Sequence, residues 1–151
     1  MTDKSKPVYT KIMKLKIVKL SDVPTPTYAN PTDAGLDLYA NEAHVIEPGQ
    51  RVLVGTGLKM EWPDGYAGLI WPRSGISTKH GVNTLAGVID SGYRGEIKVA
   101  LINLGQEAFT IEKHMRIAQM LFQRVDQAEI EIVEELSETA RGEGSFGSSG
   151  V

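Results

Sequence analysis

The strongest constraint on the fold is that the apolar residues fall in short runs between glycine and proline turns. Residues 14–17 (KLKI) alternate polar and apolar side chains, as a strand with one buried face does. Turn residues such as Pro48-Gly49 and Pro63-Asp64-Gly65 separate the runs. No long 3.6-residue stripe is present, so the pattern predicts an all-β closed or double-sheet architecture. The other strand candidates are 36–39, 50–54, 66–71, 96–104 and 116–125.

At most one short helix is expected, over 74–80, with Ser74 as its possible N-cap. Residues 129–136 (EIEIVEEL) are compatible with a helix or a strand, although Ile130 and Ile132 favour a period of two. The 151 residues fit one domain, and no repeat or linker divides them.

We expect a loose N-terminal extension over 1–11, a β-barrel domain over 12–136 and a flexible, glycine-rich arm over 137–151. The extension is rich in lysine but lacks arginine and an apolar run, so it matches neither a signal nor a transit peptide.

Composition excludes several classes of function. The net charge of −3 argues against a general nucleic-acid binder. The absence of cysteine removes disulfides, thiolate nucleophiles and cysteine-based zinc sites. No segment approaches the ~20 consecutive apolar residues that span a bilayer. We therefore expect no membrane partner and a cytoplasmic location, or the host cytoplasm or nucleus if the protein is viral.

Pro72-Arg73-Ser74-Gly75 lies between an apolar strand and the expected helix. Backbone N–H groups at a helix start attract an anion, and Arg73 adds a bidentate partner. The alternative is an ordinary capped turn with a surface arginine.

Residues 87–95 (GVIDSGYRG) carry the densest group of chemically useful side chains. The pattern predicts a hairpin with Asp90 at its mouth, where a carboxylate can accept a proton from water. The alternative is an aspartate that only forms the turn.

Asp33 and Asp37 bracket residues 34–36, and strand alternation places Asp37 on the face opposite to Leu36 and Leu38. A site with only one or two protein carboxylates suits Mg²⁺, because this ion keeps several of its waters and binds phosphate oxygens of the substrate. The alternative is two solvated acids. The three histidines have no ligand spacing.

The last stretch, RGEGSFGSSGV at 141–151, surrounds one aromatic residue, Phe146, with glycine and serine. It matches GxGxxG by letter, but only four residues follow that match, so the helix of a dinucleotide fold is missing. Its flexible N–H groups suit phosphate oxygens. The segment is either a frayed tail or a mobile arm that closes over a ligand.

Five segments in this order and spacing resemble the five motifs of the trimeric deoxyuridine triphosphatases (dUTPases). They cover almost the whole chain after the N-terminal extension. They are AGLDLYA at 34–40, PRSGIS at 72–77, AGVIDSGYRGEIKV at 86–99, RIAQMLFQRV at 116–125 and RGEGSFGSSG at 141–150.

The resemblance implies a jelly-roll β-barrel subunit and a homotrimer whose three active sites each draw motifs from all three subunits. It implies Mg²⁺-dependent hydrolysis of dUTP to dUMP and pyrophosphate. That reaction keeps uracil out of DNA and supplies dUMP for thymidylate synthesis.

The resemblance also implies roles for individual residues. Asp90 would activate a water that attacks the α-phosphorus, with Gln119 nearby, and Asp37 would reach Mg²⁺ through water. Tyr93 would lie against the deoxyribose. The remaining nucleoside contacts would be Gly87, Val88, Ile89, Asp90, Lys98 and Phe146, and the phosphate contacts would be Arg73, Ser74, Gly75, Gln119, Arg141, Gly147, Ser148 and Ser149.

Two positions differ from the family pattern. Gly92 stands where many relatives carry a second acid, and Thr84 stands where many carry an asparagine. Asn83 and Thr84 are both candidates for that contact to uracil.

Two rival functions remain. A dCTP deaminase shares the fold and the hairpin but supplies a glutamate ten residues after the hairpin aspartate, where this chain has Ala100. A non-catalytic trimeric binding or regulatory protein could also use the fold, although it would not need Asp37, Arg73 and Asp90 together.

Overall fold

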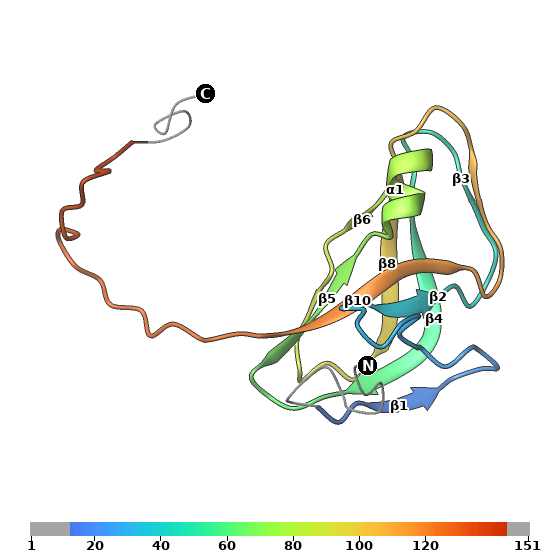
Figure 1. Cartoon of the computed structure of the whole chain (residues 1–151), viewed down its shortest axis with the longest axis horizontal. Helices are drawn as coiled ribbons and strands as arrows, with labels where there is room; N and C mark the ends of the chain where they lie inside the picture. The colour runs from blue at the N-terminus through green and yellow to red at the C-terminus, as the bar shows by residue number, and fades with distance from the viewer. Residues whose placement is uncertain (1–12, 145–151) are drawn as a thin grey trace, which may run out of the picture.

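Two four-stranded sheets face each other in the computed structural model, which describes residues 13–144 (Figure 1). The first sheet has the order β1 (Lys16–Lys19), β4 (Arg51–Glu61), β8 (Glu96–Asn103) and β6 (Val82–Leu85). The second has the order β2 (Leu36–Tyr39), β10 (Arg116–Arg124), β5 (Tyr66–Trp71) and β7 (Val88–Ile89). β3 (His44–Ile46) and β9 (Phe109–Ile111) form a small third sheet.

All strand pairs of residues 13–144 are antiparallel, and one helix, α1 (Ser74–His80), follows β5. The predicted all-β class with one short helix is therefore confirmed. No helix in this part of the chain is long and apolar enough to cross a membrane.

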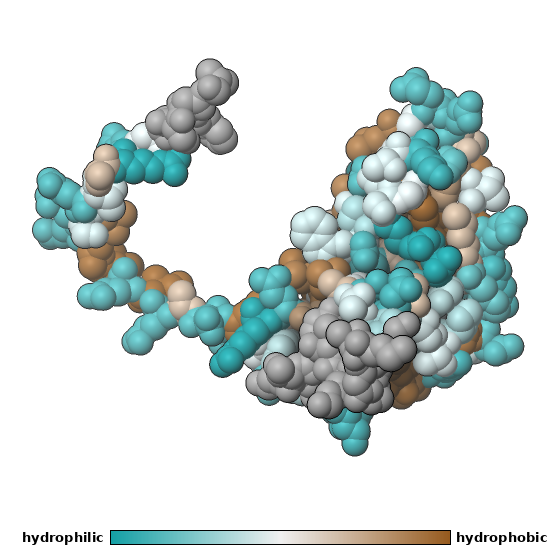
Figure 2. All heavy atoms as spheres, viewed as in Figure 1, coloured by the Kyte–Doolittle hydropathy of each residue, from teal (hydrophilic) through white to brown (hydrophobic). Residues whose placement is uncertain are grey.

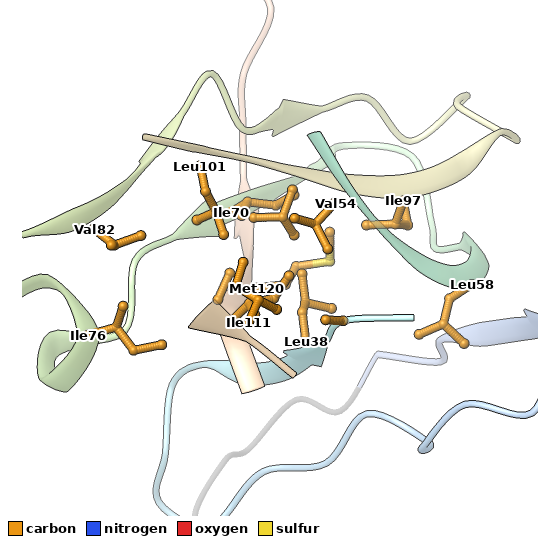
Figure 3. Packing of buried hydrophobic residues seen from close by; sticks show 14 of the residues in the cluster. Leu38, Val54, Leu58, Ile70, Ile76, Val82, Ile97, Leu101, Ile111 and Met120 are labelled. Carbon is orange, nitrogen blue, oxygen red and sulfur yellow. The ribbon is translucent and has the colours of Figure 1, made fainter. Parts of the chain in front are cut away.

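The core lies between the two large sheets (Figure 3). β8 shows why the sequence folds this way, because Ile97, Val99 and Leu101 alternate with more exposed residues and are all buried. Leu38 and Met120 face them from the second sheet and are fully buried. Burial of one such side chain stabilises the fold by about 1.5–3 kcal/mol.

β4 runs well beyond the predicted 50–54 and continues to Glu61. The prediction stopped early because Gly55 and Gly57 look like strand breakers. They instead form a bulge, where the pairing with β8 shifts between Gly55 and Lys59 and Gly57 has φ +68°. Glu96 Oε1 accepts the Gly57 N–H at 2.9 Å, so the side chain of the opposite strand satisfies the bulged backbone.

Other boundaries also differ from the sequence prediction, and β8 and β10 each end one residue earlier than expected, at Asn103 and Arg124. The first strand begins at Lys16 rather than residue 14, where its pairing with Glu61 starts. The N-cap of α1 is Arg73, with extended φ and ψ of −84° and 130° and no side-chain cap hydrogen bond, and Ser74 is the first helical residue. Gly81 ends the helix in the left-handed conformation at φ 71°.

After β10 the described chain leaves the two sheets as an extended segment (Figure 1). Residues 125–144 contain neither a strand nor a helix. Ile130, Ile132 and Leu136 are 87%, 96% and 88% exposed, and Figure 2 shows hydrophobic residues along this segment. The period of two is present in the sequence, but no strand of the same subunit pairs with it in the described part.

Asn103 joins three backbone segments inside the sandwich and is fully buried. Its Nδ2 donates to the carbonyls of Ile46 and Glu107 at 2.8 Å, and its Oδ1 accepts the Gly105 N–H at 2.8 Å. Asn103→Ala would leave the buried Ile46 carbonyl without this partner and would remove the two part-buried bonds to Glu107 and Gly105, at a cost of about 2–4 kcal/mol. Differential scanning fluorimetry should therefore show a Tm lower by roughly 5–15 °C.

Gln106→Ala is the matched control, because Gln106 is an exposed amide three residues away. Its Tm should stay within about 2 °C of the wild type, since surface substitutions usually change stability by less than about 0.5 kcal/mol. An equal Tm for Asn103→Ala and Gln106→Ala would contradict the role given to the buried amide.

Candidate active site

Asp37 and Gln119 lie side by side on the outer face of the second sheet. Gln119 on β10 pairs directly with Asp37 on β2, and directly opposed residues share one face of a sheet. Leu38 and Met120, their neighbours along the strands, point into the core. Alternation along two strands therefore presents a carboxylate and an amide together outside the sandwich, as the sequence predicted for Asp37.

Two arginines hold the Asp37 carboxylate. Arg73 Nε lies 3.2 Å from Asp37 Oδ1, and Arg116 Nη1 lies 3.3 Å from Oδ2. Asp37 is only 7% exposed, so its charge is compensated by these guanidinium groups rather than by bulk water. Both guanidinium groups are thereby oriented at the same edge of the sheet, where they can also meet an anionic ligand.

An open hollow of about 290 Å³ lies over this carboxylate. Gln119 Nε2 donates to the Pro72 carbonyl at 2.9 Å, which joins β10 to the start of α1. Gly35 must lack a side chain, because a Cβ there would lie 2.9 Å from Gln119 Cβ and closer still to its amide oxygen. The lining residues are Ala29, Asp33, Ala34, Gly35, Asp37, Arg73, Ser74, Gly75 and Gln119.

The first turn of α1 adds backbone N–H groups to the same hollow. Ser74 and Gly75 line it and are exposed, and the first N–H groups of any helix lack partners within the helix. The first turn contains no acidic residue that would compete for an anion. Guanidinium groups and free amide donors around a hollow of this size suit a phosphate chain.

The Asp90 loop, defined as residues 90–95, crosses between the two sheets. β6 pairs with β8, whereas β7 pairs with β5 in the second sheet, and the loop returns the chain to β8. Gly87 lies in the earlier connection, from β6 in the first sheet to β7 in the second, where its φ is +107° and a Cβ would lie 2.8 Å from the Ile70 carbonyl oxygen. The carbonyl of Gly87 in turn accepts the Ile70 N–H at 2.8 Å.

The predicted hairpin with Asp90 at its mouth is not formed, because β7 pairs with β5 while β8 pairs with β4 and β6. Asp90 instead begins a tight turn directly after β7. Tyr93 N donates to the Asp90 carbonyl at 3.1 Å, and the Tyr93 hydroxyl donates to the Glu96 carbonyl at 3.0 Å. Asp90 is exposed, and Tyr93 is 43% exposed. The turn therefore presents a carboxylate and an aromatic ring outward next to each other.

Asn83 and Thr84 occupy opposite faces of β6. Asn83 pairs with Ile102 and Thr84 with the buried Leu101, so Thr84 faces the sandwich and Asn83 shares the outer face with Lys98 of β8. Asn83 Oδ1 also accepts the Ser77 hydroxyl of α1 at 2.8 Å.

The predicted residues thus fall into separate groups. Asp37, Arg73, Ser74, Gly75 and Gln119 share the hollow. The candidates on β6, β7, β8 and the Asp90 loop do not line it. Arg141 lies on the extended C-terminal segment, where its Nε donates to the Gly144 carbonyl at 2.9 Å. Phe146, Gly147, Ser148 and Ser149 lie outside the described residues.

Sequence reasoning gave Arg116 no role, although it begins the fourth motif. Arg116 and Asp37 are 79 positions apart, and only the pairing of β10 with β2 brings them together. The available signal was an arginine at the start of a strand that also carries Gln119.

The donor set indicates how Mg²⁺ would be held. Among residues 13–144, no three histidine, cysteine or acidic side chains lie close enough together to hold a metal ion between them. Asp37 and Asp33 on one hollow fit a Mg²⁺ that takes most of its ligands from water and phosphate.

Comparison with known proteins identifies relatives over nearly the full length. The family model for dUTPase matches residues 21–150. The deoxyuridine 5'-triphosphate nucleotidohydrolase of Nautilia profundicola is 54% identical over 141 residues, which are 91% of this chain and 99% of the relative. That of Clostridium kluyveri is 51% identical over 128 residues, covering 83% and 90%.

Solved structures show the same fold. The Staphylococcus bacteriophage 80alpha dUTPase with dUPNHPP has a TM-score of 0.87 and 31% identity, covering 91% of this chain and 99% of that chain. A mutant dUTPase from phage phi11 of S. aureus, whose structure describes the coordination of a structural Mg(II) ion, has a TM-score of 0.76 and 26% identity, covering 81% and 97%.

Proposed function

This chain belongs to the dUTPase family and hydrolyses dUTP to dUMP and pyrophosphate, and we propose that Asp90 activates the attacking water at the α-phosphorus. The exposed carboxylate of Asp90 accepts a proton from water, the water oxygen bonds to phosphorus, and pyrophosphate leaves. Gln119 lies near the attacked phosphorus in this proposal, and Tyr93 lies against the deoxyribose.

The observation that carries the proposal is the hollow over Asp37. Phosphoryl transfer asks a protein mainly for positioning and for stabilisation of negative charge. Arg73 and Gln119 on the hollow, together with the N–H groups of Ser74 and Gly75, supply both. Lys98 and the backbone of Gly87 to Asp90 would contact the nucleoside.

We further propose a homotrimer in which sites are shared between subunits. No residue of the Asp90 loop lines the hollow of its own subunit. Trp71 and Val88 on the second sheet are 56% and 73% exposed, and the extended segment exposes more apolar residues. The strands that carry Trp71 and Val88 are paired, and exposed apolar residues gathered on neighbouring strands are typical of a subunit contact. The C-terminal arm would bring Arg141 and Phe146 to the site of a neighbouring subunit.

The family uses Mg²⁺, and we propose that Asp37 holds this ion through water in the present chain. When bound, Mg²⁺ neutralises negative charge on the phosphate chain. Asp37 shares the hollow with a second acid, Asp33, and Arg73 and Arg116 orient its carboxylate there.

Gly35→Ala tests the contribution of Gln119 without removing it. The new Cβ would displace the Gln119 side chain from the Pro72 carbonyl, so kcat for dUTP should fall about tenfold or more. Steady-state pyrophosphate release measures this, and the Tm should fall much less than for Asn103→Ala because the glycine lies at the rim of the hollow.

The double variant Gly35→Ala, Gln119→Ala is the control. If Gly35→Ala acts through Gln119, the double variant should be no slower than Gln119→Ala alone. Fully additive losses would show that Gly35→Ala damages the site by another route.

A further inference from the structure

The Asp90 loop has little backbone pairing of its own. β7 ends at Ile89 and β8 begins at Glu96, so residues 90–95 belong to no strand. The bond from Tyr93 N to the Asp90 carbonyl closes the turn but does not fix it to either sheet. The Tyr93 hydroxyl joins the turn to the start of β8 by donating to the Glu96 carbonyl at 3.0 Å, and two further side-chain contacts join it to other segments.

The first such contact comes from the turn between β4 and β5. Ser91 Oγ donates to Asp64 Oδ1 at 2.9 Å, across 27 positions in the sequence. Asp64 precedes Gly65, whose φ is +80°, and the Gly65 carbonyl accepts the Val125 N–H at 3.0 Å. Asp64 thus belongs to a turn that is attached to the end of β10, and Ser91 is the residue directly after Asp90.

The second contact is made by Arg94. Its Nη1 donates to the carbonyls of Ser91 at 2.6 Å and Tyr93 at 3.0 Å, so the guanidinium group bonds to two carbonyls of the turn. Its Nε lies 3.9 Å from Oε2 of Glu61, the last residue of β4. Lys16 Nζ lies 2.5 Å from the other oxygen of Glu61, and this hydrogen bond lowers the pKa of Glu61 below its ordinary value.

We propose that Asp64, through Ser91, and Glu61, through Arg94, are positioning residues that fix the Asp90 turn for catalysis. The proposal rests on the catalytic role proposed for Asp90. The two acids hold the turn at neighbouring points, because Ser91 is contacted both at its hydroxyl by Asp64 and at its carbonyl by Arg94. A shift of the turn would carry the Asp90 carboxylate with it.

Catalysis is more sensitive to this shift than stability is. Asp64, Ser91 and Arg94 lie near the surface, and contacts of this kind contribute little to the free energy of folding. A displacement of about 1 Å in a reacting group can reduce a rate by up to about 10²-fold. A positioning role therefore predicts a loss of kcat with an unchanged Tm, which a merely structural contact would not produce.

The test compares Asp64→Ala with Asp64→Asn. For Asp64→Ala we expect kcat for dUTP to fall about tenfold, while KM and the Kd for the imido-bridged nucleotide dUPNHPP stay within about twofold. Asp64→Asn keeps an oxygen that accepts the Ser91 hydroxyl, so it should recover most of the lost kcat. Glu47→Ala is the matched control, an exposed acid in another glycine turn, and it should retain wild-type kcat.

A double-mutant cycle tests whether Asp64 acts on the turn through Ser91. Ser91→Ala should lower kcat as much as Asp64→Ala does, and the double variant should lose no more than either single variant. Additive losses, an Asp64→Asn variant as slow as Asp64→Ala, or an unchanged kcat in Asp64→Ala would each overturn the proposal.

The role of Asp90 and the positioning role of Asp64 can be rejected independently of each other. An active Asp90→Asn variant would reject the role of Asp90 itself. Wild-type hydrolysis that depends on Asp90 but is unaffected by Asp64→Ala would reject only the positioning role.

Discussion

Asp90→Asn is expected to lower kcat for dUTP by about 10³-fold, because the amide cannot take a proton from the attacking water. The substitution changes neither the size of the side chain nor the turn that begins at Asp90. The Kd for dUPNHPP should therefore stay within about twofold of the wild-type value. A steady-state assay of pyrophosphate release measures kcat, and isothermal titration calorimetry on the same preparation measures the Kd.

Asp22→Asn is the matched control, because Asp22 is an exposed aspartate on the loop after β1. It should keep full activity. If Asp90→Asn turned over dUTP at a rate near that of Asp22→Asn, another group would have to activate the water. If Asp90→Asn lost nucleotide binding together with turnover, Asp90 would be a binding residue rather than the base.

Truncation after Glu138 should leave a folded protein whose kcat/KM for dUTP is lower by about 10²–10³-fold. The described part of the removed segment is exposed, so its loss should not lower the Tm. The removed residues include Arg141 and Phe146, and stacking on a base contributes about 1–3 kcal/mol. A charge-assisted hydrogen bond to phosphate adds about 1.5–3 kcal/mol. Wild-type kinetics for the truncated chain would show that the segment is a frayed tail with no role in catalysis.

Mixing two inactive variants tests whether sites are shared. Asp90→Asn subunits keep the arm, and truncated subunits keep Asp90. If each site takes these parts from different subunits, denaturing and refolding an equal mixture should restore about a quarter of the wild-type activity per site. Sites built from a single subunit would stay inactive in every mixture. Light scattering on the same samples should give the mass of three chains.

The parts of the fold that follow from local pattern were predicted from the sequence. β2 (Leu36–Tyr39), β5 (Tyr66–Trp71) and α1 (Ser74–His80) have the predicted bounds. Their ends are set by local turn chemistry, which a sequence displays directly. β7 has only two residues, and β3 and β9 have three each, so no period is visible in them.

The bulge in β4 required tertiary information. Gly55 and Gly57 interrupt the strand locally, but Glu96 accepts the Gly57 N–H and the Thr56 hydroxyl donates to the Ile97 carbonyl at 2.7 Å. Both partners come from β8, about 40 positions away. Local propensity therefore predicted a break, whereas pairing with β8 carries the strand to Glu61.

The sequence named individual candidate residues of the site but not their arrangement. The motifs named Asp37, Arg73 and Gln119, and the structure brings these three together. The second arginine on Asp37 depends on the register between β2 and β10, which no short motif contains. The contacts of Asp64 and Glu61 to the Asp90 loop likewise join segments that are distant in the sequence.

The structure also bears on the rival deaminase. Ala100, where that family supplies its proton-transferring glutamate, pairs with Leu53 on β4 and Leu85 on β6. Its nearest strand partners are therefore apolar. Glu96 accepts the Gly57 N–H in the bulge and does not take that place.

Pyrophosphate release from dUTP, dTTP, dCTP and UTP, measured side by side with Mg²⁺ and with EDTA, tests the central claim most directly. We expect the protein to turn over dUTP alone and EDTA to reduce the rate sharply. Comparable turnover of dCTP with release of ammonia would contradict it in favour of the deaminase. No turnover of any of the four nucleotides would contradict it in favour of a non-catalytic binding protein.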